Sequence, residues 1–274
     1  MLNIYSKLKD LGILIFLAKS IKILGIKLET LIKKNRYSKN KKYFNIQVDD
    51  DAFKMSFLNV EIDRPIHERI DGEREPETAS IIKSILRPGN HVLELGGCYG
   101  YFTMLMANAV GPNGKVVSIE GLPNTFKILK HNINLNKFKN IESYNYFIGN
   151  NSNKIKFDLT DKSPYEGIKK YNNTALDKEK KGKSIYVKCI NLSEFLDQIR
   201  FQPTHIFMDI EGFEIDALEQ LSEKYLTNNS PTFVFEHHEI FYKYGKGLEY
   251  IRQLLNENGY LVRKVYGNII AFKS

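Results

Sequence analysis

The stretch HVLELGGCYGYFT, residues 91–103, decides the fold. Its apolar run carries the acid Glu94 and is followed by Gly96, Gly97 and Gly100. A glycine-rich turn between a strand and a helix points backbone N–H groups at a charged ligand, and glycine lets the backbone come close to it. The stretch therefore predicts a strand, a ligand-binding turn and a helix that begins near residue 100.

The spacing of these glycines separates three kinds of ligand site. The dinucleotide fingerprint needs glycines at i, i+2 and i+5, but the positions counted from Gly96 hold Cys98 and Tyr101. The phosphate-binding P-loop needs GxxxxGK[ST], and the run GPNGK is one residue short and follows a helical segment. The third pattern, acid-x-Gly-x-x-x-Gly, is met by Glu94, Gly96 and Gly100. It is the turn used for S-adenosylmethionine.

The charges of S-adenosylmethionine agree with this turn. The molecule has no phosphate, and the loop has no Lys. We expect Glu94 to attract its ammonium group, backbone N–H groups to bind its carboxylate, and Glu120, at the end of the next strand, to accept the ribose hydroxyls. The residues expected to contact this cofactor are Glu94, Gly96, Gly97, Tyr99, Gly100, Glu120, Gly121 and Phe147.

Strands and helices alternate from residue 72 onward. This alternation predicts an α/β fold with a mainly parallel sheet and helices on both faces. The last two strand-like runs, YLVRKVY and NIIAFK, leave no room for a helix between them, so they are expected to pair antiparallel. Helices are predicted at 72–86, 100–110, from 123, from 191 with Asn191 as N-cap, at 213–224 and at 245–259, and strands at 92–96, 115–120, near 141–148, 204–210 and 231–237.

Two segments break this rhythm. Residues 46–72 are predicted to be irregular or short-stranded. Residues 153–190 hold two strand-like runs around a polar loop, and we expect Tyr165, Tyr171 and Asn172 of this insertion to help shape the acceptor pocket.

The basic charge lies at one end of the chain. The protein has 274 residues, 42% of them hydrophobic, and a net charge of +8. Residues 1–45 hold 11 Lys and Arg against Asp10 and Glu29, whereas the remainder holds 29 bases against 30 acids. We therefore divide the chain into a basic helical arm with its linker, residues 1–45, and one catalytic domain, residues 46–274.

The arm allows two interpretations. Its longest apolar run, residues 11–18, is too short to span a membrane, and no signal-cleavage pattern follows it. The predicted helix at 2–34 either packs on the domain or on a partner subunit, or rests on anionic lipid at the inner membrane surface. Cys98 and Cys189 form no CxxC pair and suit free thiols in a cytoplasmic protein.

Four blocks of the sequence resemble the FkbM-type S-adenosylmethionine-dependent methyltransferases. They are REPET (74–78), PGNHVLELGGCYGYFT, GKVVSIEGLPNTFKILKHNINLN and IFMDIEGFEIDAL. The cofactor turn departs from the usual DxGAnxG, with Glu94 in place of Asp and Gly97-Cys98 in place of Ala-Asn. The resemblance implies a Rossmann-like seven-strand methyltransferase sheet and methyl transfer to oxygen, with a sugar, glycan or small metabolite as acceptor.

The end of the predicted strand 204–210 supplies the candidate catalytic groups. A neutral hydroxyl is a poor nucleophile, so a base or an orienting group helps methyl transfer. Asp209 is our candidate for this role, supported by Glu211, with His238 as an alternative base. Glu214 is expected only to favour the start of a helix. Asp209, Glu211, Glu236 and a His form a conceivable metal-ligand set, but nothing in the sequence defines its geometry, so no metal is predicted.

Two other functions remain open at this stage. The charged arm suits an RNA methyltransferase, although the nearly neutral domain lacks a basic face and DIEG is not the motif of amino methyltransferases, so no nucleic acid is expected. The altered turn also suits a non-catalytic, membrane-associated module with a degenerate methyltransferase fold.

Overall fold

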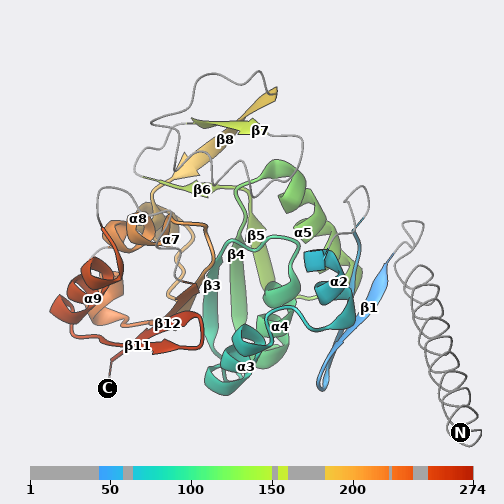
Figure 1. Cartoon of the computed structure of the whole chain (residues 1–274), viewed down its shortest axis with the longest axis horizontal. Helices are drawn as coiled ribbons and strands as arrows, with labels where there is room; N and C mark the ends of the chain where they lie inside the picture. The colour runs from blue at the N-terminus through green and yellow to red at the C-terminus, as the bar shows by residue number, and fades with distance from the viewer. Residues whose placement is uncertain are drawn as a thin grey trace, which may run out of the picture.

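A computed structural model describes residues 43–57, 64–149, 154–159, 183–221, 224–236 and 246–273. Its centre is a seven-stranded sheet in the order β5-β4-β3-β9-β10-β12-β11 (Figure 1). The strands are β3 (His91–Leu95), β4 (Lys115–Ile119), β5 (Ile141–Tyr144), β9 (His205–Met208), β10 (Thr232–Glu236), β11 (Leu261–Val265) and β12 (Asn268–Phe272).

Six of these seven strands point in the same direction, and β12 runs opposite to them. Strand β3 pairs in parallel with both β4 and β9, while β12 lies antiparallel between β10 and β11. The α/β class, the mostly parallel sheet and the antiparallel C-terminal hairpin predicted from the sequence are confirmed. Because the chain winds outward from β3 in one direction and from β9 in the other, the carboxyl ends of these two strands open a crevice for ligands.

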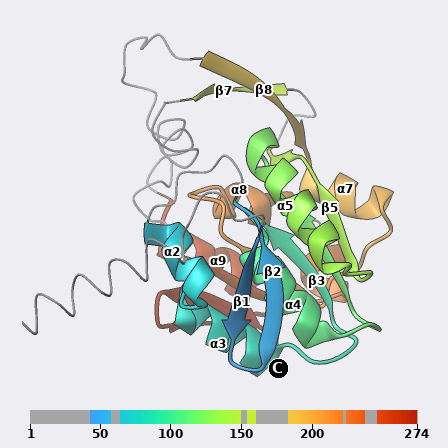
Figure 2. The same cartoon turned by 90° about the vertical axis from the view of Figure 1, so that its right-hand side faces the viewer.

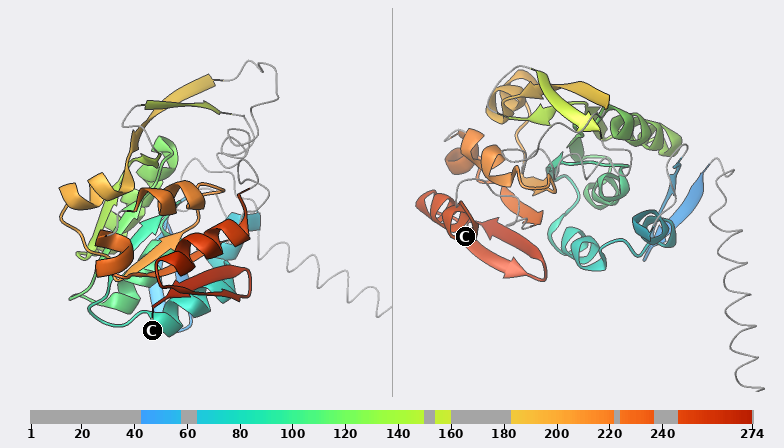
Figure 3. Two further views of the ribbon diagram at one scale, coloured as in Figure 1. Left: turned by 90° about the vertical axis from the view of Figure 1, so that its left-hand side faces the viewer. Right: turned by 45° about the horizontal axis from the view of Figure 1, so that its top comes forward.

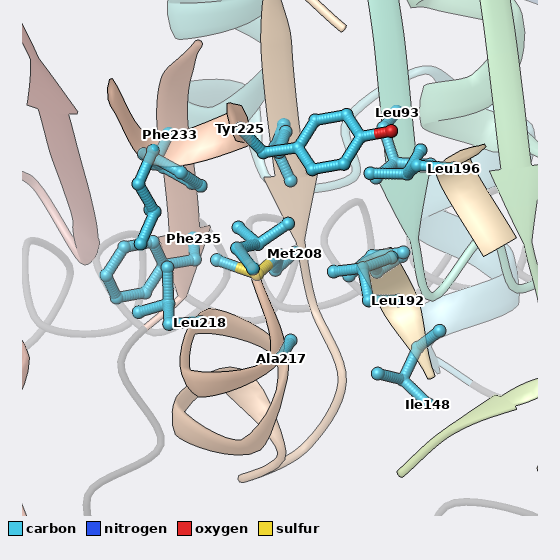
Figure 4. Close-up of a cluster of buried hydrophobic side chains, with 14 of the residues drawn as sticks. Leu93, Ile148, Leu192, Leu196, Met208, Ala217, Leu218, Tyr225, Phe233 and Phe235 are labelled. Carbon is cyan, nitrogen blue, oxygen red and sulfur yellow. The ribbon is translucent and has the colours of Figure 1, made fainter. Parts of the chain in front are cut away.

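Helices cover both faces of the sheet (Figures 2 and 3). The alternation of side chains along a strand directs Leu93 to one face and Val92 to the other, where each joins a separate core. The first face carries α7 (Leu192–Gln198), α8 (Glu214–Gln220) and α9 (Leu248–Glu257), and the second carries α3 (Pro76–Ile85), α4 (Tyr101–Val110) and α5 (Pro123–Asn136). Figure 4 shows the first core, where Leu93, Met208 and Phe233 meet Leu196 and Leu218.

Residues 44–57 and 64–71 are more regular than the sequence suggested. Strands β1 (Phe44–Val48) and β2 (Asp51–Met55) form an antiparallel hairpin whose buried residues alternate with exposed ones, and α2 (Arg64–Asp71) follows. Helix α2 buries Ile66 and Ile70, which are four residues apart and so share one helix face. The prediction of irregular structure is wrong for α2, because only two apolar residues mark its buried face.

A small sheet of three strands, in the order β6-β8-β7, lies above the upper ends of the central strands in the view of Figure 1. The single strand predicted near 141–148 is in fact two, β5 and β6 (Phe147–Ile148). Strand β6 pairs with β8 (Lys183–Ile190), which forms an antiparallel hairpin with β7 (Lys154–Leu159) that projects away from the main body (Figures 1 and 2). Tyr165, Tyr171 and Asn172 lie outside the described residues, so their place at the acceptor pocket stays a prediction.

The ends of two helices test the sequence signals directly. The Asn191 side chain caps α7 by accepting a hydrogen bond from the Glu194 N–H at 3.1 Å, as predicted. The helix predicted at 213–224 ends earlier, at Gln220, and a π-helical turn η1 (Lys224–Asn228) follows. No helix among the described residues has the length and apolar character to cross a membrane, and the basic arm up to residue 42 is not described.

We expect Leu93→Ala to lower the free energy of unfolding by about 2–5 kcal/mol, because Leu93 is fully buried in the central strand and its loss leaves a cavity. Urea unfolding of the full chain measures this. The control Leu261→Ala removes the same atoms from β11, where the side chain is 49% exposed, and should cost far less. Equal losses for the two variants would contradict the assignment of Leu93 to the core.

Candidate active site

The glycine turn is held between β3 and β4. The N–H groups of Gly96 and Gly97 both donate to the Ile119 carbonyl oxygen, at 2.8 and 3.0 Å, and the Gly100 N–H donates to the Gly97 carbonyl at 2.8 Å. Gly100, with φ +93°, is the N-cap of α4. The turn therefore lies at the carboxyl edge of the sheet, directly before a helix N-terminus, as the sequence predicted.

Gly96 also brings the end of β9 against this turn. Its φ is +93°, a conformation that favours glycine, and a Cβ there would overlap the Asp209 carbonyl oxygen. The Asp209 N–H in turn donates a hydrogen bond to the carbonyl oxygen of Leu95, the residue before Gly96, at 3.0 Å. The absence of a side chain at Gly96 thus allows Asp209 to stand beside the glycine turn.

Glu94 is a buried carboxylate behind the turn, with 5% of its surface exposed. Its Oε2 accepts hydrogen bonds from the hydroxyls of Thr103 and Ser118, each at 2.5 Å. Within the described part of the chain its Oε1 accepts none, and the residue lines the cavity described below. This free oxygen suits an ammonium group, so the residue fits the role expected of it toward S-adenosylmethionine.

Glu120 is a second buried carboxylate, one residue beyond β4. Its Oε2 accepts a hydrogen bond from the Cys98 N–H at 2.9 Å, and its Oε1 accepts one from the Leu122 N–H at 2.8 Å. A carboxylate oxygen accepts two hydrogen bonds, so each retains one position for a ribose hydroxyl. Glu120 therefore fits its expected role while also tying the glycine turn to β4.

Gly121 and Phe147 form one wall beside Glu120. A Cβ on Gly121 would lie 3.2 Å from the Phe147 ring, so only glycine lets that ring pack here without a shift. The Phe147 ring meets Phe213 edge to face, with centroids 4.6 Å apart, and Phe213 follows Asp209 by four residues. The aromatic pair therefore links the β4 side of the site to the β9 side.

Burial raises the pKa of both carboxyls. Loss of solvent raises the pKa of Glu94 to about 7, opposed by the hydrogen bonds from Ser118 and Thr103. Loss of solvent likewise raises the pKa of Glu120 to about 7, opposed by the N–H groups of Leu122 and Cys98 and reinforced by the charge of Glu94. Two desolvated acids side by side favour a cationic ligand, and S-adenosylmethionine carries a sulfonium and an ammonium.

One cavity joins the turn to the end of β9. Its walls include Glu94, Gly96, Gly97 and Asp209, all predicted site residues, so the structure brings the expected cofactor turn and the expected catalytic acid together. Its walls also include residues of other elements to which the sequence assigned no role: Arg69, Glu75, Thr78, Tyr101, Glu236 and Asn268. The REPET block (74–78) was the only sequence signal that included Glu75, and no sequence signal marked Arg69.

Six other predicted residues are described by the structure but do not line this cavity: Tyr99, Gly100, Glu120, Gly121, Phe147 and Glu211. Tyr99 is 5% exposed and packs edge to face on Phe57, with Arg69 over its ring at 5.7 Å. Gly100 packs against Leu129, and Glu211, with φ +53°, occupies the turn after Asp209. His238 lies outside the described residues. The roles of these residues remain predictions.

Glu214 shapes the turn that carries Asp209. It is the first residue of α8, is fully buried, and its Oε1 accepts hydrogen bonds from the N–H groups of Ile210 and Gly212 at 3.3 Å. This agrees with the expectation that Glu214 serves the helix start rather than the reaction.

The Methyltransferase FkbM domain matches residues 91–262, more than half of the chain. A protein-L-isoaspartate O-methyltransferase of Methanothrix thermoacetophila is 39% identical over 56 residues, which are 20% of this chain and 27% of that protein. A second such enzyme, from Triticum aestivum, is 44% identical over 43 residues, 16% of this chain and 19% of that one. The chain thus spans about a quarter or less of the curated relatives that it matches.

Solved structures with a similar fold include two methyltransferases. An S-adenosylmethionine-dependent methyltransferase from Aquifex aeolicus is 18% identical, with a TM-score of 0.41 over 73% of this chain and 90% of that one. Precorrin-6y C5,15-methyltransferase from Geobacter metallireducens is 13% identical, with a TM-score of 0.46 over 84% and 98% of the two chains. Similarity at this level says nothing about the reaction of this chain.

The domain match covers β3, β4, β9 and β10 and hence the glycine turn and Asp209. The chain therefore belongs to the FkbM methyltransferase domain family, and the family and the S-adenosylmethionine cofactor predicted from its motifs are confirmed at the level of the family.

Gly96→Ala should destabilise the protein more than Gly89→Ala. Both glycines have positive φ, +93° and +89°, so both substitutions carry the same backbone cost, but a Cβ at position 89 has nothing within 4 Å. The difference between their free energies of unfolding, measured by urea titration, isolates the clash with the Asp209 carbonyl. We expect a difference of about 1–3 kcal/mol. Equal effects would show that the close approach is not needed.

Glu94→Gln should stabilise the cofactor-free protein at pH 8 and weaken binding of S-adenosylmethionine. The folded-state pKa of about 7 lies above the ordinary 4.5, so between these values the folded state holds more protons and the free energy of unfolding falls as pH rises. The substitution removes this loss, so its gain should be present at pH 8 and vanish near pH 4.5.

Unfolding curves at the two pH values, with calorimetry of the cofactor at pH 8, measure both effects. Glu142→Gln is the control of opposite sign, because the Lys115 ammonium, chiefly through its hydrogen bond, lowers the pKa of Glu142. A stability of Glu94→Gln that tracks the wild type across this range would contradict the raised pKa.

Proposed function

We propose that this protein transfers the methyl group of S-adenosylmethionine to a hydroxyl oxygen of a sugar, glycan or small metabolite. The observation that carries the proposal is the single cavity lined by both the glycine turn and Asp209. The turn and the two buried acids suit the cofactor, and the exposed Asp209 carboxylate stands where an acceptor would enter.

S-adenosylmethionine supplies an electrophilic methyl group, whose carbon bonds to the acceptor oxygen while the electron pair of the broken C–S bond stays on sulfur. The protein has to hold the acceptor oxygen in line with that bond. In this proposal Asp209 either receives the hydroxyl proton or orients the hydroxyl by accepting its hydrogen bond. Glu211, in the following turn, supports it.

The arrangement on the cofactor side supports a cationic methyl donor. Oε1 of Glu94 receives the ammonium group, and Glu120 accepts the ribose hydroxyls at the end of β4. Tight backbone contact between Gly96 and Asp209 sets the distance between the donor turn and the acceptor side. Glu94 and Glu120 would serve a binding module equally well, so turnover is the deciding measurement.

Asp209→Asn should bind S-adenosylmethionine with nearly wild-type affinity and lose at least about 100-fold in turnover, because general-base and orienting groups contribute this much. Glu120→Ala should instead weaken binding of the cofactor itself. Calorimetry measures binding, and transfer of a labelled methyl group from S-adenosylmethionine into a glycan or metabolite extract, with a one-methyl mass shift in the product, measures turnover.

The two variants separate the parts of the proposal. Full turnover in Asp209→Asn would reject the role of that residue, and cofactor binding unchanged in Glu120→Ala would reject the cofactor arrangement. A wild-type protein that binds S-adenosylmethionine yet methylates nothing in such extracts would point to a binding module.

A further inference from the structure

Three carboxylates from separate elements meet at the acceptor end of the cavity. One oxygen each of Glu75, Asp209 and Glu236 lies within 4.8 Å of the other two. Glu75 is the N-cap residue of α3, Asp209 follows β9, and Glu236 ends β10. They are far apart in the sequence, and the order of β9 and β10 in the sheet together with the packing of α3 brings them to one place.

This spacing suits a divalent cation with oxygen ligands. Such ions bind oxygen at about 2.0–2.1 Å for Mg²⁺ and about 2.3–2.6 Å for Ca²⁺, so ligands on opposite sides of one ion stand about 4–5 Å apart. Three oxygens at most 4.8 Å apart lie within about 2.8 Å of a common centre, so an inward movement of roughly 0.7 Å brings each of them to the Mg²⁺ distance. Carboxylates are the ligands that these ions prefer.

The charge of the cavity also favours a cation. Among the described residues, four acids line it, Glu94 and the three above, whereas Arg69 is the one lining Lys or Arg. The neighbouring Arg74 pairs with Glu75 from outside the lining. Burial raises the pKa of the Glu75 carboxyl, the charges of Arg74 and Arg69 lower it, and the charge of Glu236 raises it. A cation bound among the three carboxylates would offset the effects of burial and of Glu236.

A second, independent feature points into the same cavity. Tyr101 is 2% exposed and lines the cavity, and its hydroxyl has no hydrogen-bond partner within the described part of the chain. Whatever the phenol oxygen receives from the backbone N–H of Arg74, the phenol proton has no acceptor among the described residues. A buried donor without an acceptor is costly, and an oxygen ligand in the cavity would satisfy it.

The backbone at Glu75 directs its side chain to this place. Glu75 has φ +44°, an unusual value for a residue other than glycine. Although it is the N-cap residue of α3, its side chain makes no capping hydrogen bond and instead pairs with Arg74 beside the other two acids. The carboxylate is therefore not used for the usual purpose of an acid at a helix start.

We propose that Glu75, Asp209 and Glu236 bind a divalent cation of the Mg²⁺ or Mn²⁺ class, and that the Tyr101 hydroxyl donates to an oxygen ligand of that ion. Binding of the ion is independent of the reaction, but its role rests on the proposed methyl transfer. A cation-bound acceptor hydroxyl loses its proton to water more readily, and its oxygen then attacks the methyl carbon as the C–S bond breaks. Asp209 acts here as an orienting group.

The test is binding of Mn²⁺ to the full chain, followed by the electron paramagnetic resonance signal of the free ion and by calorimetry. We expect the wild type to bind Mn²⁺ at this site, Glu75→Gln and Glu236→Gln to bind it at least tenfold more weakly, and Tyr101→Phe to bind it a few-fold more weakly. Glu77→Gln, two residues from Glu75 on the exposed face of α3, removes the same charge and should not change the affinity.

No Mn²⁺ binding by the wild type, or equal affinity in Glu75→Gln, Glu236→Gln and the wild type, overturns the proposal. Thermal unfolding shows whether each variant folds. If one variant does not fold, the proposal is judged on Mn²⁺ binding by the wild type and by the variants that do fold. S-adenosylmethionine binding and methyl transfer, with and without a chelator, are measured separately. If no Mn²⁺ binds and methyl transfer continues in the presence of a chelator, only the metal site is rejected. If Mn²⁺ binds but S-adenosylmethionine does not, only the proposed function is rejected.

Discussion

The backbone of Gly96 lies against the Asp209 carbonyl oxygen, and the Asp209 N–H donates a hydrogen bond to the Leu95 carbonyl oxygen. This contact joins β3 to β9 at the carboxyl ends of the two strands. Any side chain at position 96 would push the two ends apart. The turn that faces the cofactor and the acid that faces the acceptor are therefore placed by one backbone contact, and their separation does not depend on flexible side chains.

Around that contact the protein gathers five carboxylates. Glu94 and Glu120 are buried behind the turn, and three further carboxylates meet in front of it. Burying a carboxylate is unfavourable unless hydrogen bonds or a cation offset the cost. Hydroxyls of Thr103 and Ser118 and two backbone N–H groups offset part of it. The remainder suits ligands of positive charge, first a sulfonium donor and then, at the acceptor end, a metal ion.

The sequence predicted those parts of the site whose residues are close together along the chain. Glu94 and its glycines stand within seven residues, and Asp209 ends an apolar run, so local patterns marked them. A local pattern does not say where a side chain points, as Tyr99 illustrates. It sits in the middle of the glycine motif, yet its side chain is directed to the hydrophobic core, against Phe57. Helix α2, with Arg69, was not predicted because a helix this short contains too few apolar residues to display a helical repeat.

The residues of this chain by themselves determined the alternation of strands and helices, the turn chemistry and the family, because each depends on neighbours within a few positions. The tertiary structure alone decided the order of the strands, with β12 inserted between β10 and β11, and the meeting of Glu75, Asp209, Glu236 and Tyr101. Strand order follows from how separate helices and strands pack together to bury their apolar faces, and no local pattern records that choice. The acidic cluster exists only because that packing brings the ends of α3, β9 and β10 to one point.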